Sequence, residues 1–429
     1  MRCLKNLLIT CVQIIKEIDM IHKLLNNLAY YPIAIDNRLL RKKIRRNIPK
    51  LVEVVRKKDR IKVLFVLSNL SKWKTEALYR AMLVHPRFDP IIGIALGVVD
   101  YPTYEANNLS SLIAYIEEKG YSYTELRLTA DIQERIQPDI IFYQQADGGI
   151  YDCLNFNHIR EVLFCYIAYG VANGTAAYAY NDVYHNICWY WFVENELVID
   201  YAKTVMSNQA RNLVPTGTPM ADELLADRQF VTNPWKQQGK LKKRVIWAPH
   251  HTIGSGKEEI HYGTFLQVAD GILELAKKYH KDTQWAFKPH PSLKQKLYYI
   301  WGENRTNEYY RTWSDMDNTQ FEDGKYAALF MYSDAMIHDC GAFTTEYLFM
   351  RKPCMYLVNG KEHPLNSFGK GCYEQYYKGT NVADIEQFVE NVIHGIDPMK
   401  GQREKFFHDY LLPPNGKTAC ENIIDSILG

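Results

Sequence analysis

The sequence predicts an α/β protein in which two parallel-sheet domains follow a basic helical arm. The chain has 429 residues, 47% of them apolar and 13% aromatic, which is enough for two hydrophobic cores. Apolar strand runs alternate with helical patterns in two successive series, and this alternation favours parallel sheets covered on both faces. Residues 214–219, Val-Pro-Thr-Gly-Thr-Pro, separate the two series and are typical of an interdomain hinge.

Residues 1–60 form the predicted arm. They hold 15 Lys and Arg against 5 Asp and Glu, a balance of +10, whereas the rest of the chain holds 36 against 44, a balance of −8. The apolar stretch at 7–15 is too short to span a bilayer, and no small-residue cleavage site follows it. The basic and apolar residues of 38–46 and 51–58 suit amphipathic helices on an anionic membrane surface. Solvated helices packed on the next domain are the alternative.

The first series predicts a Rossmann-like domain over residues 61–213. Its first strand is the apolar run 61–67, which ends at Ser68 and Asn69 and precedes a helix at 75–84. The other elements of this series are strands at 90–96, 139–144 and 161–167 and a helix at 104–119.

The second series predicts a second Rossmann-like domain over residues 214–429. Its expected elements are a strand at 244–249, a helix at 263–279, a strand at 284–288, a helix at 321–332, and a strand–helix–strand unit over 335–358. The helix of that unit is expected to run for about eleven residues from Phe343. The last helix, 418–428, is a candidate to pack back on the first domain.

Polar residues follow three strands of the second series. In open α/β sheets, ligands bind beyond the carboxyl ends of the strands. The residues at these positions are His250, His251 and Thr252, then Lys288 and His290, and then Asp339. The turn at Gly341 leads into a helix start with Thr344, Thr345 and Glu346, where backbone N–H groups and hydroxyls favour a phosphate. Together these residues predict a nucleotide-diphosphate site.

Each of these pieces also has a structural interpretation. A histidine after a strand is often a packed or surface residue, and Lys288-Pro289-His290-Pro291 is also typical of a rigid turn. Zinc is a rival ligand for the histidines. We expect no metal, because side chains of adjacent residues diverge on an extended chain and His250 and His251 are adjacent.

The first series offers two candidate catalytic residues. His185 lies in an aromatic segment, 178–186, and histidine is the side chain most easily poised as a general base near neutral pH. A histidine packed under Tyr184 and Trp189 is the alternative. Tyr169 follows the strand run 161–167 and is the second candidate.

Several chemistries lack their motifs. No GxxxxGK[ST], GxGxxG, GxSxG or HExxH pattern occurs, which disfavours NTPases, dinucleotide-dependent dehydrogenases, esterases and zinc proteases. The nine cysteines are odd in number and form no CxxC pair, so we expect a reducing compartment and no disulfide framework.

Four segments in order resemble the CDP-glycerol:poly(glycerophosphate) glycerophosphotransferases, the teichoic-acid primases and polymerases. These segments are Thr216-Gly217-Thr218-Pro219 with Asp222 and Leu224, Trp247-Ala248-Pro249-His250, Lys288-Pro289-His290-Pro291, and Ser333-Asp334 through Asp339, Gly341 and Glu346 to Lys352-Pro353. The resemblance implies a GT-B architecture, two Rossmann-like domains facing a cleft, with His290 and the turn from Asp339 to Glu346 holding the CDP part of the donor. Two positions depart from the family pattern. Tyr169-Gly170 stands where the family usually has a His-Gly pair, and Gly341-Ala342 replaces its paired serines.

The resulting expectation is a transferase in teichoic-acid, capsule or other surface-polymer synthesis. It moves glycerol phosphate, another polyol phosphate or a sugar from a CDP-activated donor to an acceptor hydroxyl, with His185, Tyr169 or His250 in catalysis and no cofactor. The expected partners are the donor, a lipid-linked or polymer acceptor and an anionic membrane surface bound by residues 1–60, but no nucleic acid. The expected location is cytoplasmic, on the inner face of the membrane. The alternatives are a glycosyltransferase using another nucleotide-sugar, a nucleotide-sugar epimerase, and a non-catalytic binding module.

Overall fold

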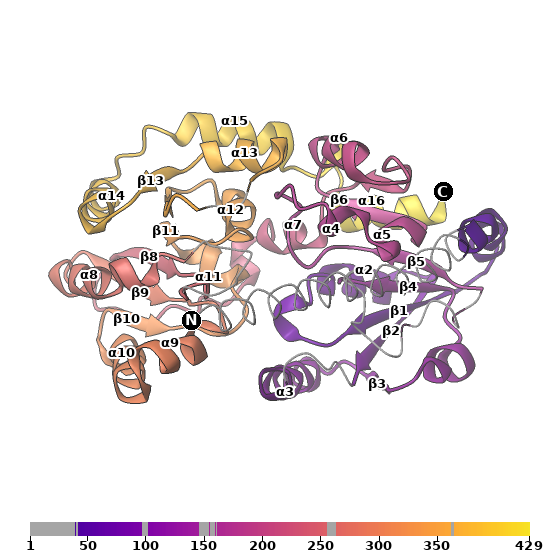
Figure 1. Ribbon diagram of the computed structural model, residues 1–429, viewed down its shortest axis with the longest axis horizontal. Helices are drawn as coiled ribbons and strands as arrows, with labels where there is room; N and C mark the ends of the chain where they lie inside the picture. The colour runs from indigo at the N-terminus through magenta and orange to yellow at the C-terminus, as the bar shows by residue number, and fades with distance from the viewer. Residues whose placement is uncertain are drawn as a thin grey trace, which may run out of the picture.

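The computed structural model describes residue 39 and residues 42–429, except 97–101, 146–153, 155–158, 160, 255–262 and 362–363. It contains two parallel sheets with helices packed on them, so the predicted α/β class is confirmed (Figure 1). Most of the basic arm, residues 1–38, 40 and 41, lies outside the described residues.

The first sheet has seven parallel strands in the order β3-β2-β1-β4-β5-β6-β7. The strands are β1 (Ile61–Leu67), β2 (Phe88–Ala95), β3 (Tyr123–Leu126), β4 (Ile140–Tyr143), β5 (Leu163–Tyr166), β6 (Tyr190–Val193) and β7 (Leu213–Pro215). The helices of this half are α2 (Glu76–Val84), α3 (Pro102–Glu118), the π-helix η2 (Asp131–Ile136), α4 (Tyr178–Asn181), α5 (Val183–Ile187), α6 (Glu196–Val205) and α7 (Pro219–Leu224), with short 3₁₀ turns η1 (Leu70–Lys72) and η4 (Arg228–Phe230).

The second sheet has six parallel strands in the order β10-β9-β8-β11-β12-β13. The strands are β8 (Lys243–Ala248), β9 (Thr283–Phe287), β10 (Thr319–Phe321), β11 (Ala335–His338), β12 (Cys354–Leu357) and β13 (Tyr377–Gly379). The helices are α8 (Phe265–Lys278), α9 (Leu293–Trp301), α10 (Glu303–Asp315), α11 (Ala327–Tyr332), α12 (Phe343–Glu346), α13 (Ser367–Glu374), α14 (Val382–His394), α15 (Lys400–Tyr410) and α16 (Ala419–Leu428), with short turns η5 (Tyr347–Met350) and η6 (Pro414–Gly416).

Both sheets reverse their strand order at one place. In the first sheet the reversal lies between β1 and β4, and in the second it lies between β8 and β11. This order is that of doubly wound nucleotide-binding sheets, in which ligands bind at the reversal, called the switch point. The central strands form because runs such as Ile61–Leu67 are apolar on both faces and are buried almost throughout.

Two sequence-based helix boundaries need correction, and the expected hinge has regular structure. The segment expected as a hinge, 214–219, contains the end of β7 and the start of α7, which packs on α2 of the first domain and on α11 of the second. The helix expected at 321–332 starts six residues later, because Phe321 ends β10. The helix expected to run about eleven residues from Phe343 is α12, with four residues, followed by the 3₁₀ turn η5.

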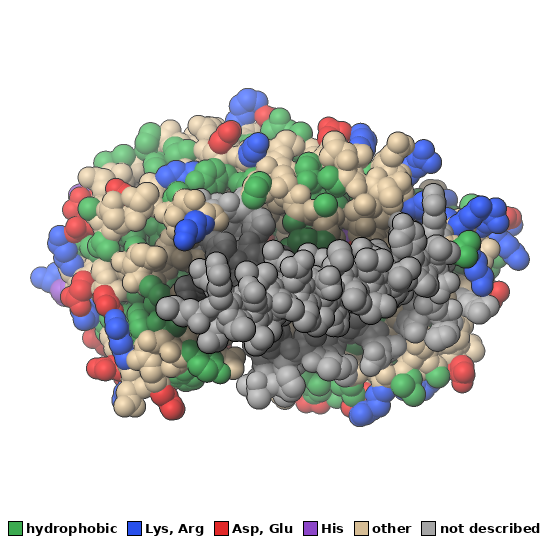
Figure 2. Space-filling view, in the orientation of Figure 1, with side chains coloured by type: hydrophobic (Ala, Val, Ile, Leu, Met, Phe, Trp, Pro, Cys, Tyr) green, Lys and Arg blue, Asp and Glu red, His purple; other side chains and the backbone are tan. Residues whose placement is uncertain are grey.

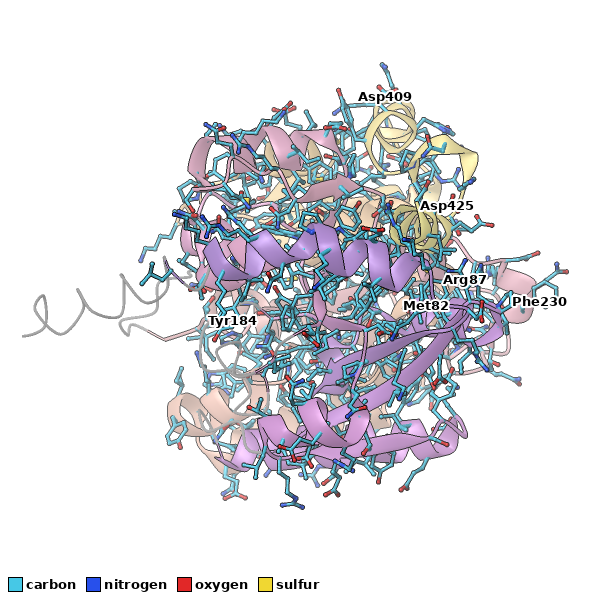
Figure 3. The ribbon with its side chains drawn as sticks, turned by 90° about the vertical axis from the view of Figure 1, so that its right-hand side faces the viewer. Met82, Arg87, Tyr184, Phe230, Asp409 and Asp425 are labelled. Carbon is cyan, nitrogen blue, oxygen red and sulfur yellow. The ribbon has the colours of Figure 1, made fainter. Side chains whose placement is uncertain are left out.

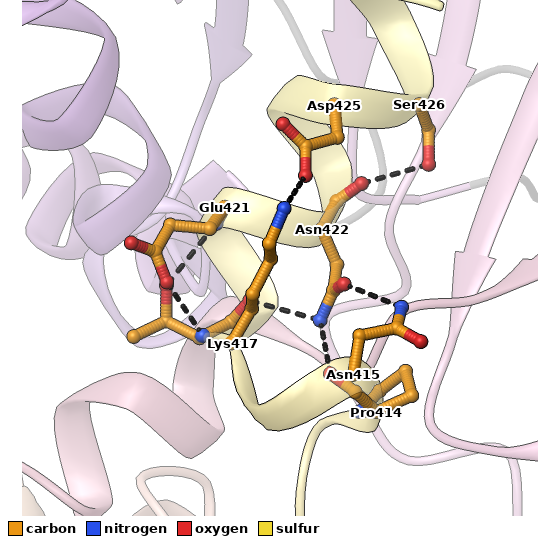
Figure 4. Close-up of polar contacts among 8 residues, drawn as sticks. Pro414, Asn415, Lys417, Glu421, Asn422, Asp425 and Ser426 are labelled. Atoms are coloured by element: carbon orange, nitrogen blue, oxygen red, sulfur yellow. Dashed lines mark hydrogen bonds and ion pairs between the residues drawn. The ribbon is translucent and has the colours of Figure 1, made fainter.

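The last helix, α16, lies beside α2 and α7 of the first domain (Figure 1). The carboxylate of Asp222 accepts hydrogen bonds of 2.8 Å from the backbone N–H groups of Ala419 and Cys420. A capping box of Thr418 and Glu421 satisfies further N–H groups at this helix start, and Asn422 donates to the carbonyl of Pro414 (Figure 4). The last helix thus packs on the first domain.

A helix over residues 42–56 packs on the first domain. Its apolar face joins the first-domain core through Val55 and neighbouring residues. Arg45 Nε donates to the carbonyl of Asn186 at 2.9 Å, and Arg56 Nε donates to the carbonyl of Ile427 in α16 at 3.0 Å. Figure 3 views this face of the molecule and labels Asp425 of α16. The described part of the arm therefore packs on the first domain through its apolar face.

Candidate active site

The carboxyl ends of three neighbouring strands bring the predicted residues of the second domain together. His250 and His251 follow β8, Lys288 and His290 follow β9, and Asp339 follows β11. Because β9, β8 and β11 are adjacent in the sheet, these residues lie at its switch point. The grouping expected from the sequence is therefore the one that the structure contains.

Asp339 anchors this site from within. Its side chain is fully buried and accepts hydrogen bonds from the backbone N–H groups of His250 and Thr264, both at 2.6 Å, and from the Thr264 hydroxyl at 2.8 Å. Burial raises the pKa of this carboxyl to about 6, although these donors act to lower it. Asp339 thus positions the loops that carry the histidines, instead of facing a ligand as expected.

The three histidines form a compact cluster. Ring centroids lie 4.3 Å apart for His250 and His251, 5.1 Å for His250 and His290, and 4.1 Å for His251 and His290. The expectation that His250 and His251 diverge is therefore wrong, because the chain bends after β8. Burial lowers the pKa of His251 to about 4 and of His290 to about 3, and holds that of His250 well below its usual range. All three rings are neutral at pH 7.

The hydrogen bonds of these rings bear on what the cluster can bind. One nitrogen from each ring lies within 4.8 Å of the others, a spacing that a metal ion requires. However, His290 Nδ1 accepts the N–H of Ser292 at 3.1 Å, and His250 Nδ1 accepts that of Thr252 at 3.4 Å. Because Nδ1 of His250 and His290 accepts these bonds, the proton of each neutral ring lies on Nε2. A metal ion would need a lone pair on that nitrogen. The cluster therefore suits an anion, which accepts from Nε2–H groups, better than a metal ion.

Lys288 supplies the positive charge at the end of β9. Its ammonium donates to the carbonyl of Gly324 at 2.8 Å. Burial lowers its pKa to about 8, so the group is still mainly protonated at pH 7. Thr252 contributes differently, since its hydroxyl contacts His250 Nδ1 at 3.0 Å and accepts the N–H of Gly263. It shapes the loop.

The turn after β11 differs from the expectation. Thr344 donates its hydroxyl to the carbonyl of Cys340 at 2.9 Å, and Thr345 donates to Cys372 Sγ at 3.4 Å. These two hydroxyls thus bond within the chain and do not face a ligand, and a four-residue helix has a small dipole. Glu346 accepts the hydroxyl of Tyr326, while the Gly341 carbonyl accepts Asn173 Nδ2 of the first domain at 2.8 Å.

The two first-domain candidates lie in different surroundings. Tyr169 follows β5, is 42% exposed, and donates its backbone N–H to the carbonyl of Gln144, beyond β4. Its ring lies under the ammonium of Lys72 at 5.2 Å, so it borders the first switch point. His185 is 3% exposed and stacks on Trp191 at 4.7 Å.

His185 serves as a capping residue. Its Nδ1 accepts the backbone N–H of Asp182 in a capping box at the start of α5, and the next residue, Asn186, contacts Arg45 of the helix at 42–56. Burial lowers its pKa to about 4. The expectation of His185 as general base is therefore corrected to the alternative, a packed histidine with a structural hydrogen bond.

Sequence reasoning missed the residues that join the two domains. Lys74 follows β1, and its ammonium donates to Tyr326 of the second domain. Lys325 of the second domain forms an ion pair with Glu76 of the first domain. The rule that strand ends carry function could have indicated Lys74, which lies seven residues after Leu67, but no pattern in the sequence indicates its partner.

Comparison with known proteins identifies the family. The model of the CDP-Glycerol:Poly(glycerophosphate) glycerophosphotransferase family matches residues 172–428, more than half of the chain. The chain belongs to this family. It is therefore a glycerophosphotransferase-type enzyme. The matched region includes every second-domain strand and the strand-end cluster, by which we mean His250, His251, Lys288 and His290. No curated protein matches the chain.

Solved structures of similar fold include two kinds of enzyme. A UDP-N-acetylglucosamine 2-epimerase from Listeria monocytogenes, described as putative, has 14% identity and a TM-score of 0.57, over 86% of this chain and 96% of that one. The epimerase from Neisseria meningitidis, bound to UDP-GlcNAc, has 13% identity and a TM-score of 0.56, over 86% and 99%. A variant of the wall teichoic acid polymerase TagF has 13% identity and a TM-score of 0.57, over 92% and 97%. These likenesses show the GT-B fold.

Proposed function

We propose that this enzyme transfers glycerol phosphate from CDP-glycerol to a hydroxyl of a lipid-linked or polymer acceptor in teichoic-acid or related surface-polymer synthesis. The observation that carries the proposal is the group of His250, His251, Lys288 and His290 at the switch point of a family member. A TagF structure soaked with CDPG has the same fold, with 14% identity and a TM-score of 0.54 over 92% of this chain and 97% of that one.

The proposed reaction is a substitution at phosphorus. The acceptor oxygen bonds to the glycerol-side phosphorus of the donor, the bond from that phosphorus to the bridging oxygen breaks, and CMP leaves with the bond's electron pair. Lys288 and the Nε2–H groups of His250 and His290 offset the negative charge of the diphosphate and of the departing CMP. Donors fixed in a site with little water stabilise such charge strongly, because they need no reorganisation during the reaction.

The acceptor hydroxyl also has to lose its proton. The ring of His251 is neutral and only partly buried, so we assign proton acceptance to it. A bound diphosphate adds negative charge beside the ring and raises its pKa from about 4. We assign a contact with the acceptor to Tyr169, which is half-exposed at the first switch point.

Ligand-induced thermal shifts test the donor assignment. The compounds are CDP-glycerol, CDP-ribitol, CMP-sugars, UDP-sugars and CDP alone, each at the same concentration. We expect CDP-glycerol and CDP to raise the Tm of the wild-type protein and to have little effect on the Lys288→Gln variant. Stabilisation by a UDP-sugar but by no cytidine compound would reject the donor assignment.

The helix at 42–56 supports a proposed membrane contact of residues 1–60. Its apolar residues face the first domain, while Lys42, Lys43, Arg46 and Lys50 are exposed. Figure 2 shows Lys and Arg side chains at this end of the molecule. Among the described residues, no helix is both long enough and apolar enough to cross a bilayer. A basic face near an anionic surface gains about 1 kcal/mol for each Lys or Arg, which suits a peripheral position on the inner face of the cell membrane.

Vesicle sedimentation tests the membrane contact. We expect the full chain to sediment with vesicles containing anionic lipid but not with neutral ones, and binding to weaken in a Lys42→Glu, Lys43→Glu double variant. Equal binding of the wild type and this variant would remove the helix at 42–56 from the proposal. A Lys203→Glu, Lys277→Glu variant, changed on α6 and α8, is the control.

An epimerase acting on a nucleotide-sugar is the second candidate, because two of the similar folds described above are UDP-GlcNAc 2-epimerases. Epimerised UDP-GlcNAc without CMP release would favour the epimerase.

A further inference from the structure

Lys74 lies at the switch point of the first sheet. It follows β1, and its backbone N–H donates to Gln144 Oε1 beyond β4 at 2.6 Å. The residue is 9% exposed, which is rare for a lysine. The peptide of Lys74 is thus fixed between the two strands at which the strand order reverses.

The side chain of Lys74 reaches into the second domain. Its ammonium lies 4.4 Å from the ring centroid of Tyr326, donates to the Tyr326 hydroxyl, and is 3.9 Å from Glu346 Oε1. The same hydroxyl donates to Glu346 Oε2. Because Glu346 belongs to the turn after β11, this first-domain lysine contacts the turn that borders the second switch point.

A second pair crosses the boundary in the opposite direction. Lys325 of the second domain pairs with Glu76 at the start of α2, and the Glu76 side chain is only 6% exposed. Glu76 also accepts hydrogen bonds from the hydroxyls of Tyr115, at 3.0 Å, and Tyr121, at 3.2 Å. Each domain therefore contributes one lysine and one glutamate to what we call the crossed ion pairs, Lys74–Glu346 and Lys325–Glu76.

The crossed ion pairs favour one arrangement of the domains. Separating the domains would leave Glu76 and Glu346 without their lysines, and a charge that loses its partner before it is solvated is strongly unfavourable. The pairs lie next to the strand-end cluster, since Lys74 and Lys288 both lie over the ring of Tyr326, at 4.4 and 5.6 Å from its centroid.

We propose that Lys74 and Lys325 are positioning residues, which hold the second switch point against the first so that donor and acceptor meet in line for transfer. This inference rests on the proposed function for its catalytic consequence, but its structural part holds for any ligand. Neither lysine is assigned a contact with the reacting atoms.

Hydrogen exchange of the full chain without ligand tests the structural part. The reporters are two backbone hydrogen bonds of 3.0 Å between the domains, Thr175 N–H to the Pro364 carbonyl and Asn366 N–H to the Asn173 carbonyl. We expect Lys74→Met and Lys325→Met each to accelerate exchange at 173–175 and 364–366 about tenfold, while Lys203→Met, on an exposed pair of α6, leaves it unchanged. If Lys74→Met fails to fold, hydrogen exchange in Lys325→Met, whose lysine is more exposed, and in the near-isosteric Glu76→Gln tests the positioning role instead.

Steady-state kinetics with CDP-glycerol test the catalytic part. We expect kcat to fall about a hundredfold in Lys74→Met and Lys325→Met, since misplaced reactants lose about that much rate, with KM for CDP-glycerol within about threefold of the wild type. The double variant Lys325→Met, Glu76→Gln should be no worse than Lys325→Met alone. Unchanged exchange at both reporters, or an unchanged kcat, would overturn the proposal. Absence of turnover in the wild type would instead reject the proposed function. The hydrogen-exchange rates of the two reporters would then test the structural part of the proposal alone.

Discussion

The carboxylate of Asp339 accepts a hydrogen bond of 2.6 Å from the backbone N–H of His250, which fastens the histidine loop to the end of the neighbouring strand. The same carboxylate holds Thr264 at the start of α8. In Asp339→Asn, the side-chain NH₂ group replaces one carboxylate oxygen and faces a backbone N–H that has then lost its acceptor. We therefore expect the free energy of unfolding to fall by about 2 kcal/mol and the affinity for CDP to weaken at least tenfold. Thermal unfolding and calorimetric titration measure these two quantities.

Asp315→Asn is the control for this change, because Asp315 is exposed at the end of α10. It should leave both the Tm and the affinity for CDP unchanged. If Asp339→Asn lowers stability but binds CDP like the wild type, the carboxylate would be an anchor of the core and not of the site.

The pKa of Lys288, about 8, predicts the pH dependence of donor binding. The ammonium attracts the diphosphate and is lost as pH rises through that pKa, so the Kd for CDP should rise between about pH 7.5 and 9.5. Because binding of an anion raises the pKa, the midpoint should lie above 8. Lys288→Gln should bind weakly at all these pH values, with Lys281→Gln as the exposed control.

Lys288 should affect folding stability in the opposite sense. Its pKa is lower in the folded chain than the usual 10.5, so between about pH 8 and 10.5 the unfolded chain binds more protons at this group. Its contribution to stability therefore rises with pH in this window, while donor affinity falls. The difference in Tm between the wild type and Lys288→Gln, measured across the window, isolates this contribution from other titrations. A constant difference would contradict the lowered pKa.

His185→Ala should change stability and leave catalysis nearly intact. The variant loses the capping contact with Asp182 and the stacking on Trp191, which together stabilise the fold by about 2 kcal/mol. We expect a lower Tm but kcat/KM for CDP-glycerol within about threefold of the wild type, and no effect from the exposed control His394→Ala. A loss of several hundredfold in kcat at an unchanged Tm would restore His185 as the general base.

The hydrogen bonds from Ala419 and Cys420 to Asp222 predict the effect of loosening α16. Asp222→Asn removes a negative charge from a helix N-terminus and one acceptor, which should lower stability by about 1–2 kcal/mol. Hydrogen exchange over 419–428 should become faster. Asp425→Asn, which removes an exposed pair with Lys417, should leave exchange at 419–424 as in the wild type. Equal effects of the two changes would refute the anchoring role of Asp222.

The sequence was most informative where one physical rule dominates. Strands such as β1 are buried on both faces, so an apolar run such as Val63–Leu67 identifies them. By contrast, β10 and β13 have three residues each, which is too short for any periodic pattern. The family resemblance and the two-domain α/β fold could both be recognised from residue patterns.

The site was only partly predictable. The rule that ligands bind beyond strand ends found His250, Lys288 and His290, but it does not tell which way a side chain turns. Asp339 and Thr344 face backbone groups of their own domain, and these partners become neighbours only in the folded chain. Likewise, Lys74 and Glu346 are 272 positions apart in the sequence and meet only because the two switch points face each other.

The proposed transfer from CDP-glycerol is tested by measuring CMP release together with acceptor elongation. Purified protein is incubated with CDP-glycerol and a short poly(glycerol phosphate) or lipid-linked acceptor, and both products are followed by mass spectrometry. We expect one CMP for each glycerol phosphate added to the acceptor, with turnover reduced at least a hundredfold in Lys288→Gln and His290→Asn. Elongation without CMP, or no CMP with any of these acceptors while UDP-GlcNAc is converted, would contradict the proposed transfer.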